Sequence, residues 1–200
     1  MTAARLEVRG LEGNTFEQTA HDAAEAAVKP CKGAEKVGEV FGNFDPAHAK
    51  SEIQKFLASN PGKIDFVEQQ GSQGAGVIQA FEAAGRDVPP MAISGTSGGD
   101  LAWWDAHKDT YDSVGYHYSG PQTGYAVFQV GLRMLNGQGL KVRDIHPPGI
   151  KVTNDNVGDV ATPGKPITWI GDIRGPVTDY ITPEQIDWFF EKAGDPEAGN

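Results

Sequence analysis

The sequence contains a single cysteine, Cys31, among its 200 residues. One cysteine excludes an internal disulfide and a zinc site built from several thiolates. No apolar run approaches the roughly 18 residues that a membrane-spanning helix requires. The five histidines show no His-Glu-x-x-His or comparable ligand spacing. The sequence therefore predicts no metal site and no cofactor.

Basic residues are fewer than acidic ones, 17 against 27, which gives a formal net charge of -10. A surface that follows nucleic-acid phosphates must carry net positive charge, so we expect no nucleic-acid partner. The stretch from Met1 to Val8 lacks the apolar segment of a signal peptide, so the sequence predicts no export signal on this chain. An apolar fraction of 38% and a charged fraction of 22% are typical of a globular protein.

Short apolar strands alternate with helices through the first two thirds of the sequence. The expected strands are 6–8, 36–41, 64–67, 90–94 and 114–118. The expected helices are 16–28, 47–57, 77–84, 101–107 and 125–135. Strict alternation predicts an α/β fold, a doubly wound parallel sheet with helices on both faces. Ligands of such sheets gather at the carboxyl ends of the strands, so we expect the functional residues in the loops at that edge.

Residues beyond 140 have a different character, with recurring prolines and no helix before Thr182. Thr182 and Pro183 begin a short helix, because one caps its start and the other suits its first turn. The aromatic residues 188–190 are expected to pack against the rest of the chain.

Two glycine-rich loops invite a functional interpretation. The run from Gly95 to Gly99 matches the G-x-S-x-G nucleophile elbow, with Ser97 as nucleophile and Asp144 and His146 as formal partners. Because Asp144 and His146 are only two residues apart, they have little freedom to form a relay, and a serine hydrolase is a minor alternative. The other loop, 71–76, has its glycines in the wrong register for a dinucleotide fingerprint, so a plain turn is expected.

Neutral polar and aromatic side chains follow the carboxyl ends of several expected strands. They are Asn14, Thr15, Phe16, Gln18, Phe44, Ser51, Gln69, Gln70, Thr96, His117 and Tyr118. Neutral hydrogen-bonding groups beside aromatic faces suit an uncharged polyol better than a phosphate or a metal ion.

Several runs together resemble the carboxyl-terminal half of type I periplasmic sugar-binding proteins, the ribose-binding-like solute receptors of ABC transporters. The runs are Ile64–Gly71, Gly76–Pro90, Val37–Lys50, Gly120–Val127, Leu132–Gly137 and Ile181–Gln185. Each run is moderately specific, and their shared order carries the resemblance.

The resemblance implies a protein of two doubly wound lobes that trap a sugar between them. This chain would be one of the two lobes. It implies a sugar-binding lobe over residues 1–157, an extension over 158–200 that packs on the lobe, and a missing amino-terminal lobe. It further implies solute binding without catalysis, a periplasmic or extracytoplasmic location, and an ABC transporter permease as partner. The effector-binding lobe of a sugar-responsive regulator is the alternative within this fold.

We expect ligand contacts at eight residues of the carboxyl edge, of which Gln18, Ser51, Gln70, Thr96 and Tyr118 fall at or near ligand positions of the family that the sequence resembles. The eight residues are Asn14, Thr15, Phe16, Gln18, Ser51, Gln70, Thr96 and Tyr118. This sequence departs from the family pattern near Gln18, where an arginine is absent, and near Thr96, where an aspartate is absent.

The helix expected over 125–135 packs on the other lobe in the family. Its apolar side chains would lack that partner in this chain: Ala126, Val127, Val130, Leu132, Met134 and Leu135. Because exposed apolar surface drives association, we expect the chain to self-associate or to borrow a partner lobe.

Overall fold

The computed structural model describes residues 2–117, 120–145, 149–171, 173 and 182–191. Contacts divide the chain into two compact units. Unit 1 comprises residues 1–117 and 151–174, and unit 2 comprises residues 118–150 and 175–200. Among the described residues, no helix combines the length and the apolar character needed to cross a membrane.

The centre of unit 1 is a six-stranded sheet with the order β2-β1-β3-β4-β5-β6. The strands are β1 (Ala3–Arg9), β2 (Ala34–Phe41), β3 (Phe66–Gln70), β4 (Met91–Ser94), β5 (Val114–His117) and β6 (Ile150–Val152). Every pairing among β1 to β5 is parallel. The expected parallel α/β sheet is therefore confirmed.

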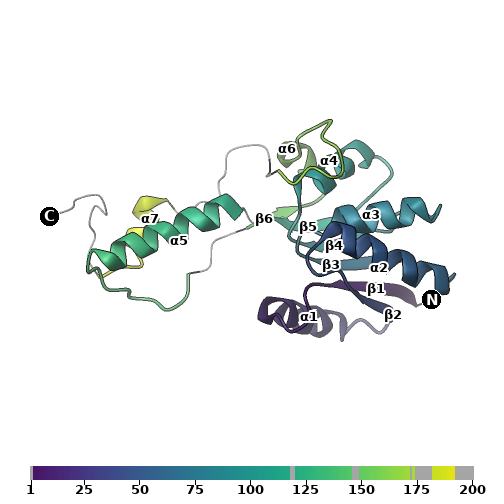
Figure 1. Ribbon diagram of the computed structural model, residues 1–200, viewed down its shortest axis with the longest axis horizontal. Helices are drawn as coiled ribbons and strands as arrows, with labels where there is room; N and C mark the ends of the chain where they lie inside the picture. The colour runs from purple at the N-terminus through teal and green to yellow at the C-terminus, as the bar shows by residue number, and fades with distance from the viewer. Residues whose placement is uncertain (1, 118–119, 146–148, 172, 174–181, 192–200) are drawn as a thin grey trace. The chain divides into compact units, whose positions relative to one another are not determined.

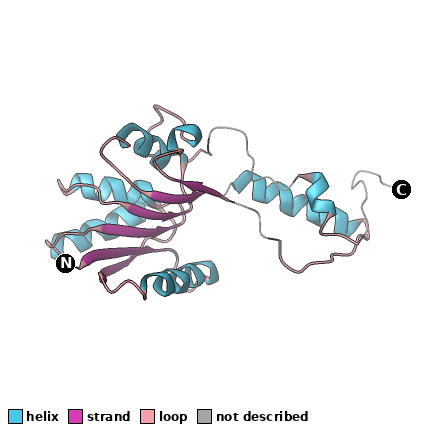
Figure 2. Cartoon of the chain, turned by 180° about the vertical axis from the view of Figure 1, so that it is seen from behind, coloured by secondary structure: helices cyan, strands magenta, loops and turns pink. Residues whose placement is uncertain are grey.

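Helices of unit 1 lie on both faces of this sheet (Figures 1 and 2). The helices of unit 1 are α1 (Thr15–Val28), α2 (Pro46–Ser59), α3 (Gly74–Ala83), α4 (Gly98–His107) and α6 (Val157–Val160). Unit 2 contains α5 (Gly120–Leu135) and α7 (Pro183–Asp187). The connection from β1 to β2 leads toward one edge of the sheet, whereas the connections from β2 to β3 and on to β5 lead toward the other edge. Since such connections are right-handed, α1 lies on one face while α2 and α3 lie on the other.

Apolar packing fills the space between the sheet and the α2–α3 layer. Leu6, Val8 and Val67 project from the strands and are fully buried. Ala49, Ile53 and Leu57 of α2 repeat at helical spacing and are also buried, as the sequence pattern predicts. Asp45 caps α2, since its side chain accepts a hydrogen bond from the backbone N–H of His48.

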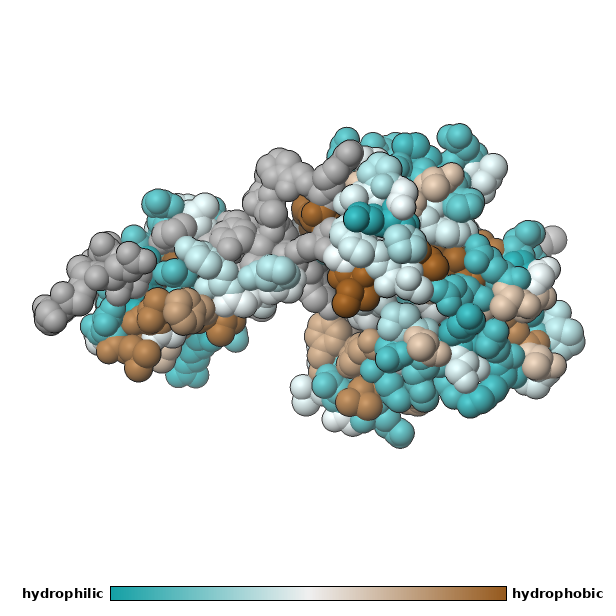
Figure 3. All heavy atoms as spheres, turned by 45° about the horizontal axis from the view of Figure 1, so that its top comes forward, coloured by the Kyte–Doolittle hydropathy of each residue, from teal (hydrophilic) through white to brown (hydrophobic). Residues whose placement is uncertain are grey.

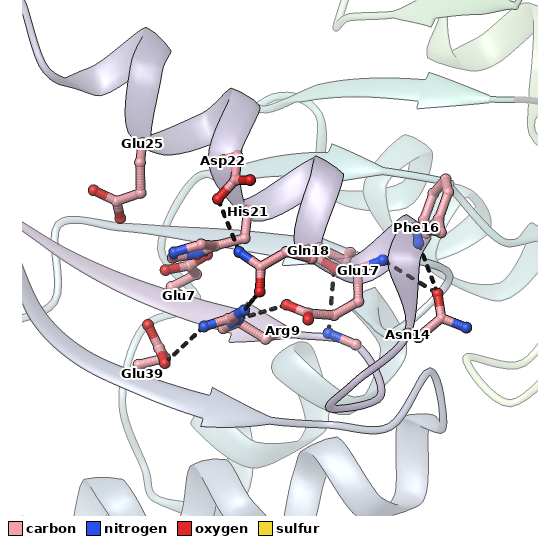
Figure 4. A network of polar contacts seen from close by, with 12 residues as sticks. Glu7, Arg9, Asn14, Phe16, Glu17, Gln18, His21, Asp22, Glu25 and Glu39 are labelled. Atoms are coloured by element: carbon pink, nitrogen blue, oxygen red, sulfur yellow. Dashed lines mark hydrogen bonds and ion pairs between the residues drawn. The ribbon is translucent and has the colours of Figure 1, made fainter.

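The opposite face of β1 meets α1 through charges. Arg5, Glu7 and Arg9 share one side of the strand, because alternate residues point the same way. The α1 residues that contact them, Glu17, His21 and Glu25, are spaced by four. They pair in the reverse sequence order, because α1 runs antiparallel to β1. Arg9 pairs with Glu17 at 2.5 Å, Glu7 with His21 at 2.6 Å, and Arg5 with Glu25 at 2.5 Å. These pairs fix α1 on the strand in a single register; Figure 4 shows Arg9 with Glu17, and Glu7 beside His21.

Two expected loops are partly helical instead. Helix α3 begins at Gly74 and α5 at Gly120, several residues before their expected starts. Gly76 explains the first difference, because an added Cβ would lie 2.2 Å from the carbonyl oxygen of Pro46. The glycine thus permits close approach of α3 to α2 rather than forming a loop. The elements β6 and α6 have only three and four residues, too few for a periodic pattern.

The residues beyond 150 are divided between the two units, whereas the resemblance implies a single extension over 158–200. The segment from 151 to 174 belongs to unit 1. There Asn154 accepts a hydrogen bond from the Trp104 indole at 2.6 Å and donates one to the Tyr111 carbonyl at 2.8 Å. In unit 2, Thr182 forms the expected capping box, and Phe190 is fully buried while Trp188 is 68% exposed.

The α2–α3 contact predicts the effect of replacing Gly76 by alanine. We expect Gly76→Ala to lower the free energy of unfolding by about 1–3 kcal/mol, because the backbone of Pro46 cannot easily give way. Gly62→Ala is the matched control, since an added Cβ there meets nothing within 4 Å. Urea unfolding of both variants measures the difference, and equal midpoints would show that the two helices are not in close contact.

Candidate functional site

Four loops meet at the carboxyl edge of the sheet in unit 1. They follow β1, β2, β3 and β4, which are parallel and therefore end at the same edge. Left-handed backbone concentrates there, with φ of 58° at both Asn43 and Phe44 and 57° at Ser72. Non-glycine residues rarely adopt such angles, and they cluster at binding and catalytic sites.

The ring of Phe44 joins three of these loops. An added Cβ at Gly10 would lie 2.1 Å from this ring, and one at Gly71 would lie 2.6 Å from it. The ring centroid of Phe16 is 6.0 Å away, with an interplanar angle of 60°. Phe16 is 48% exposed, so the pair presents an aromatic surface to solvent at this edge.

Three buried glutamines lie beside the aromatic pair. The Gln70 carbonyl oxygen accepts a hydrogen bond from the Gly10 N–H at 3.3 Å, and that of Gln69 accepts one from the Gln73 N–H at 3.1 Å. The Gln73 amide donates to the carbonyl oxygens of Arg9 and Gln70. Gln69 Nε2, Gln70 Nε2 and Gln73 Oε1 are buried, and no described residue bonds to them. The edge thus carries neutral donors and an acceptor with spare capacity.

The loop after β4 holds a buried polar pair. Thr96 Oγ1 and His117 Nδ1 are 2.8 Å apart, and the two side chains are 4% exposed. Ser97 is the N-cap of α4 and forms a capping box with Asp100, whose carboxylate accepts from the Ser97 N–H at 2.8 Å.

The structure does not favour the hydrolase alternative. Ser97 has an ordinary extended backbone, with φ of -113° and ψ of 161°, rather than the strained conformation of a nucleophile elbow. His117, a buried histidine at the end of β5, bonds to Thr96, and no described hydrogen bond joins it to Ser97. Asp144 belongs to the other unit, and His146 lies outside the described residues.

Side chains predicted at the start of α1 lie at the same edge, but two of them hold the helix in place (Figure 4). Asn14 is the N-cap and accepts from the Phe16 N–H at 2.9 Å. Gln18 donates to Asp22 at 2.8 Å and accepts from Arg9 at 3.5 Å. Thr15 is exposed in the first turn. Their roles as ligand contacts stay predictions.

Of the two remaining predicted residues, the structure describes only Ser51. Ser51 is exposed on α2, and no contact described for the chain links it to the loops. Tyr118 lies outside the described residues. The sequence interpretation overlooked Gln73 and Arg9. Gln73 stands directly before the glycines of α3, which was a usable signal, whereas nothing in the pattern separated Arg9 from other strand charges.

One group of side chains has the separation of metal ligands. Ligand atoms of Glu7, His21 and Glu25 lie within 4.8 Å of one another. However, Lys36 bonds to Glu7 at 3.2 Å, and Arg5 bonds to Glu25. These cations already supply the positive charge that a metal ion would bring, and the Arg5 guanidinium holds the pKa of Glu25 below its usual value.

Several solved structures with the same fold are ABC transporter solute-binding proteins. One from Thermobispora bispora has a TM-score of 0.70 and 23% identity, covering 84% of this chain and 51% of its own. One from Bacillus halodurans, with bound myo-inositol, has a TM-score of 0.67 and 21% identity over 79% of this chain and 54% of its own. The arabinose-binding component from a Shewanella species, bound to α- and β-L-arabinofuranose, has a TM-score of 0.66 and 21% identity over 79% and 53%.

These similarities confirm, at the level of the fold, the resemblance seen in the sequence. The chain spans about half the length of these proteins. No family model matches the sequence, and no curated protein matches it significantly.

Asp100 predicts how stability depends on pH. Burial raises the pKa of Asp100 from 3.8 to about 7. Between these values the folded chain retains a proton that the unfolded chain loses, so the free energy of unfolding falls as pH rises from about 4 to about 7. The slope due to this group is at most about 1.4 kcal/mol per pH unit. Asp100→Asn should remove it while retaining an acceptor for the Ser97 N–H.

Urea unfolding of both proteins at several pH values between 4 and 8 measures this contribution. The contributions of other titrating groups to the free energy of unfolding cancel when the variant is subtracted from the wild type at each pH. The stability of the wild type relative to the variant should decline through the window, and parallel curves would mean that Asp100 is ionised throughout.

Proposed function

We propose that the carboxyl edge of this sheet is one half of a binding site for a small uncharged sugar or polyol. The main support is the combination of unpartnered buried amides with an exposed aromatic ring. Gln69, Gln70 and Gln73 provide neutral donors and an acceptor, and Phe16 provides an apolar face. Amides recognise hydroxyl groups, while aromatic faces pack on the C–H surface of a sugar ring.

The ligands of the similar structures support the same chemical class. Among them are myo-inositol, D-allose and L-arabinofuranose, each a neutral molecule with several hydroxyl groups. By this likeness the chain would serve an ABC transporter permease outside the cytoplasm, as a binding component without catalytic chemistry. The missing half of the site would come from a second lobe, because this chain matches only about half of the length of these structures.

A half site is expected to bind weakly, because much of the ligand surface remains in water. With a dissociation constant on the order of 1 mM, a sugar at about 20 mM would stabilise the folded chain by about 2 kcal/mol. That stabilisation corresponds to a rise in Tm of roughly 5 °C for a chain of this size.

The test is a thermal-shift and calorimetry panel of myo-inositol, D-allose, L-arabinose and D-fructose. At least one should raise Tm, and Phe16→Ala should weaken its binding by roughly threefold to tenfold through loss of the aromatic contact. Leu11→Ala is the control, because Leu11 lies in the same loop region with a similar exposure of 47%. The proposal fails if no sugar of the panel binds, or if the two variants lose affinity equally.

A further inference from the structure

Four helices of unit 1 begin at the same edge of the sheet as the proposed sugar site. They are α1, α2, α3 and α4, each of which follows a parallel strand and therefore starts at the carboxyl edge (Figure 1). The unbonded N–H groups and the dipole of a helix N-terminus attract anions, so helix N-termini at such an edge commonly bind phosphate groups. The groups that already contact these four N-termini therefore decide whether the edge accepts a charged ligand.

The carboxylate of Asp100 lies at the N-termini of two of these helices. Asp100 is in the first turn of α4, is 1% exposed, and accepts a hydrogen bond from the Ser97 N–H at 2.8 Å through Oδ1. Its Oδ2 lies at the start of α3, where an added Cβ on Gly74 would be 2.6 Å from it. This Oδ2 is buried, and no described residue donates a hydrogen bond to it. One buried carboxylate thus lies beside both first turns, where an anion would otherwise bind.

The segment 167–171 covers the first turn of α4 with carbonyl oxygens. The Gly98 N–H donates to the carbonyl oxygen of Gly171 at 2.9 Å. An added Cβ on Gly99 would collide with the carbonyl oxygens of Ile167 and Trp169. In a nucleophile elbow the N–H after the serine binds the oxyanion, whereas here Gly98 has a partner within the chain. Carbonyl oxygens are the negative ends of peptide dipoles, so an anion at this turn would be repelled.

The N-termini of α1 and α2 also hold oxygen atoms. Asn14 caps α1 through its side-chain oxygen, and Glu17, which is 1% exposed, lies in the first turn. Asp45 caps α2, since its Oδ1 accepts from the His48 N–H at 2.8 Å. Each of the four N-termini at this edge therefore has a carboxylate in its cap, in its first turn or beside it.

Two cations near this edge do not offset these carboxylates. Arg9 is paired with Glu17 at 2.5 Å and with Glu39 at 3.1 Å. Lys165 is exposed, and its Nζ lies 5.1 Å from the centre of the Trp169 ring, so water and salt screen its charge. The Asp100 carboxylate is buried, and charges in the protein interior interact more strongly because the surroundings are less polarisable.

The net charge of the chain adds little to this local effect. Acidic residues exceed basic ones, 27 against 17, and hydrophilic residues cover most of the face of unit 1 that Figure 3 shows. Salt screens charges on such a surface within about 8 Å at physiological ionic strength. Selection between charged and neutral ligands therefore depends on the carboxylates beside the site.

We propose that Asp100 makes the carboxyl edge reject anionic ligands, so that sugar phosphates and sugar acids are excluded while neutral sugars are admitted. This inference rests on the proposed sugar site and adds to it a residue that sets specificity from a buried position, without touching the ligand. A negative charge about 10 Å from the carboxylate would lose roughly tenfold in affinity at an effective dielectric constant of about 20.

NMR titration at pH 8 tests the selection with two pairs of ligands. The pairs are myo-inositol with myo-inositol 1-phosphate, and D-fructose with D-fructose 6-phosphate. Burial raises the pKa of Asp100 to about 7 and that of the neighbouring Tyr111 to about 12, so at pH 8 the first is ionised and the second is neutral. For each neutral sugar that binds, the wild type should bind the phosphate at least tenfold more weakly.

Asp100→Asn separates charge from shape, because asparagine has nearly the same size and keeps an acceptor for the Ser97 N–H. The variant should reduce the ratio of the two affinities roughly tenfold and leave the affinity for the neutral sugar unchanged. Asp87→Asn is the matched control, because Asp87 is exposed in the loop before β4, at the opposite edge of the sheet. Circular dichroism confirms that each variant is folded. Added salt gives a measurement that needs no variant, since it should raise the affinity of the wild type for the phosphates only.

Equal affinities of the wild type for a sugar and its phosphate would overturn this inference. So would the same affinity ratio in the wild type and Asp100→Asn, because exclusion would then come from shape. Both results leave the binding of neutral sugars, and hence the proposed function, intact. If no neutral sugar binds, the proposed function fails and this inference fails with it.

Discussion

The matched register of charges between β1 and α1 is the constraint on which the rest of unit 1 depends. Arg5, Glu7 and Arg9 are spaced by two residues on the strand, and Glu17, His21 and Glu25 are spaced by four on the helix, so only one antiparallel register pairs all six. Glu7 and Glu17 are almost fully buried. A shift of α1 would leave charges buried without partners, which costs several kcal/mol each. The register thereby places Asn14 and Phe16 at the carboxyl edge and confines α1 to one side of the sheet.

Much of the fold could be predicted from the sequence, because alternation of strands and helices is a local property. Alternating burial and capping residues such as Asp45 mark the elements of unit 1 up to β5. The starts of α3 and α5 were misplaced because glycine was interpreted as a loop residue, whereas Gly76 lies at a helix contact. The grouping of residues 151–174 with unit 1 depends on Asn154 reaching Trp104, a contact between residues 50 apart that no local pattern reveals.

The candidate site was predictable in position and only partly in detail. Parallel strands bring their carboxyl ends together, so Gln70 and Thr96 could be placed at the edge from order alone. What each side chain does there depends on its partners. Asn14 caps a helix, Thr96 bonds to His117, and Gln73, which the sequence interpretation overlooked, ties β1 to β3.

The central claim is that a neutral sugar binds at the carboxyl edge of this sheet. The most direct measurement is the amide chemical-shift map of the labelled chain during titration with myo-inositol. The account predicts progressive shifts confined to the loops that follow β1, β2, β3 and β4, centred on Gly10, Phe44, Gln73 and Thr96. Shifts concentrated on α1 beyond its first turn, or on α5, would contradict this account. So would a spectrum unchanged by myo-inositol and by each of the other sugars at high concentration.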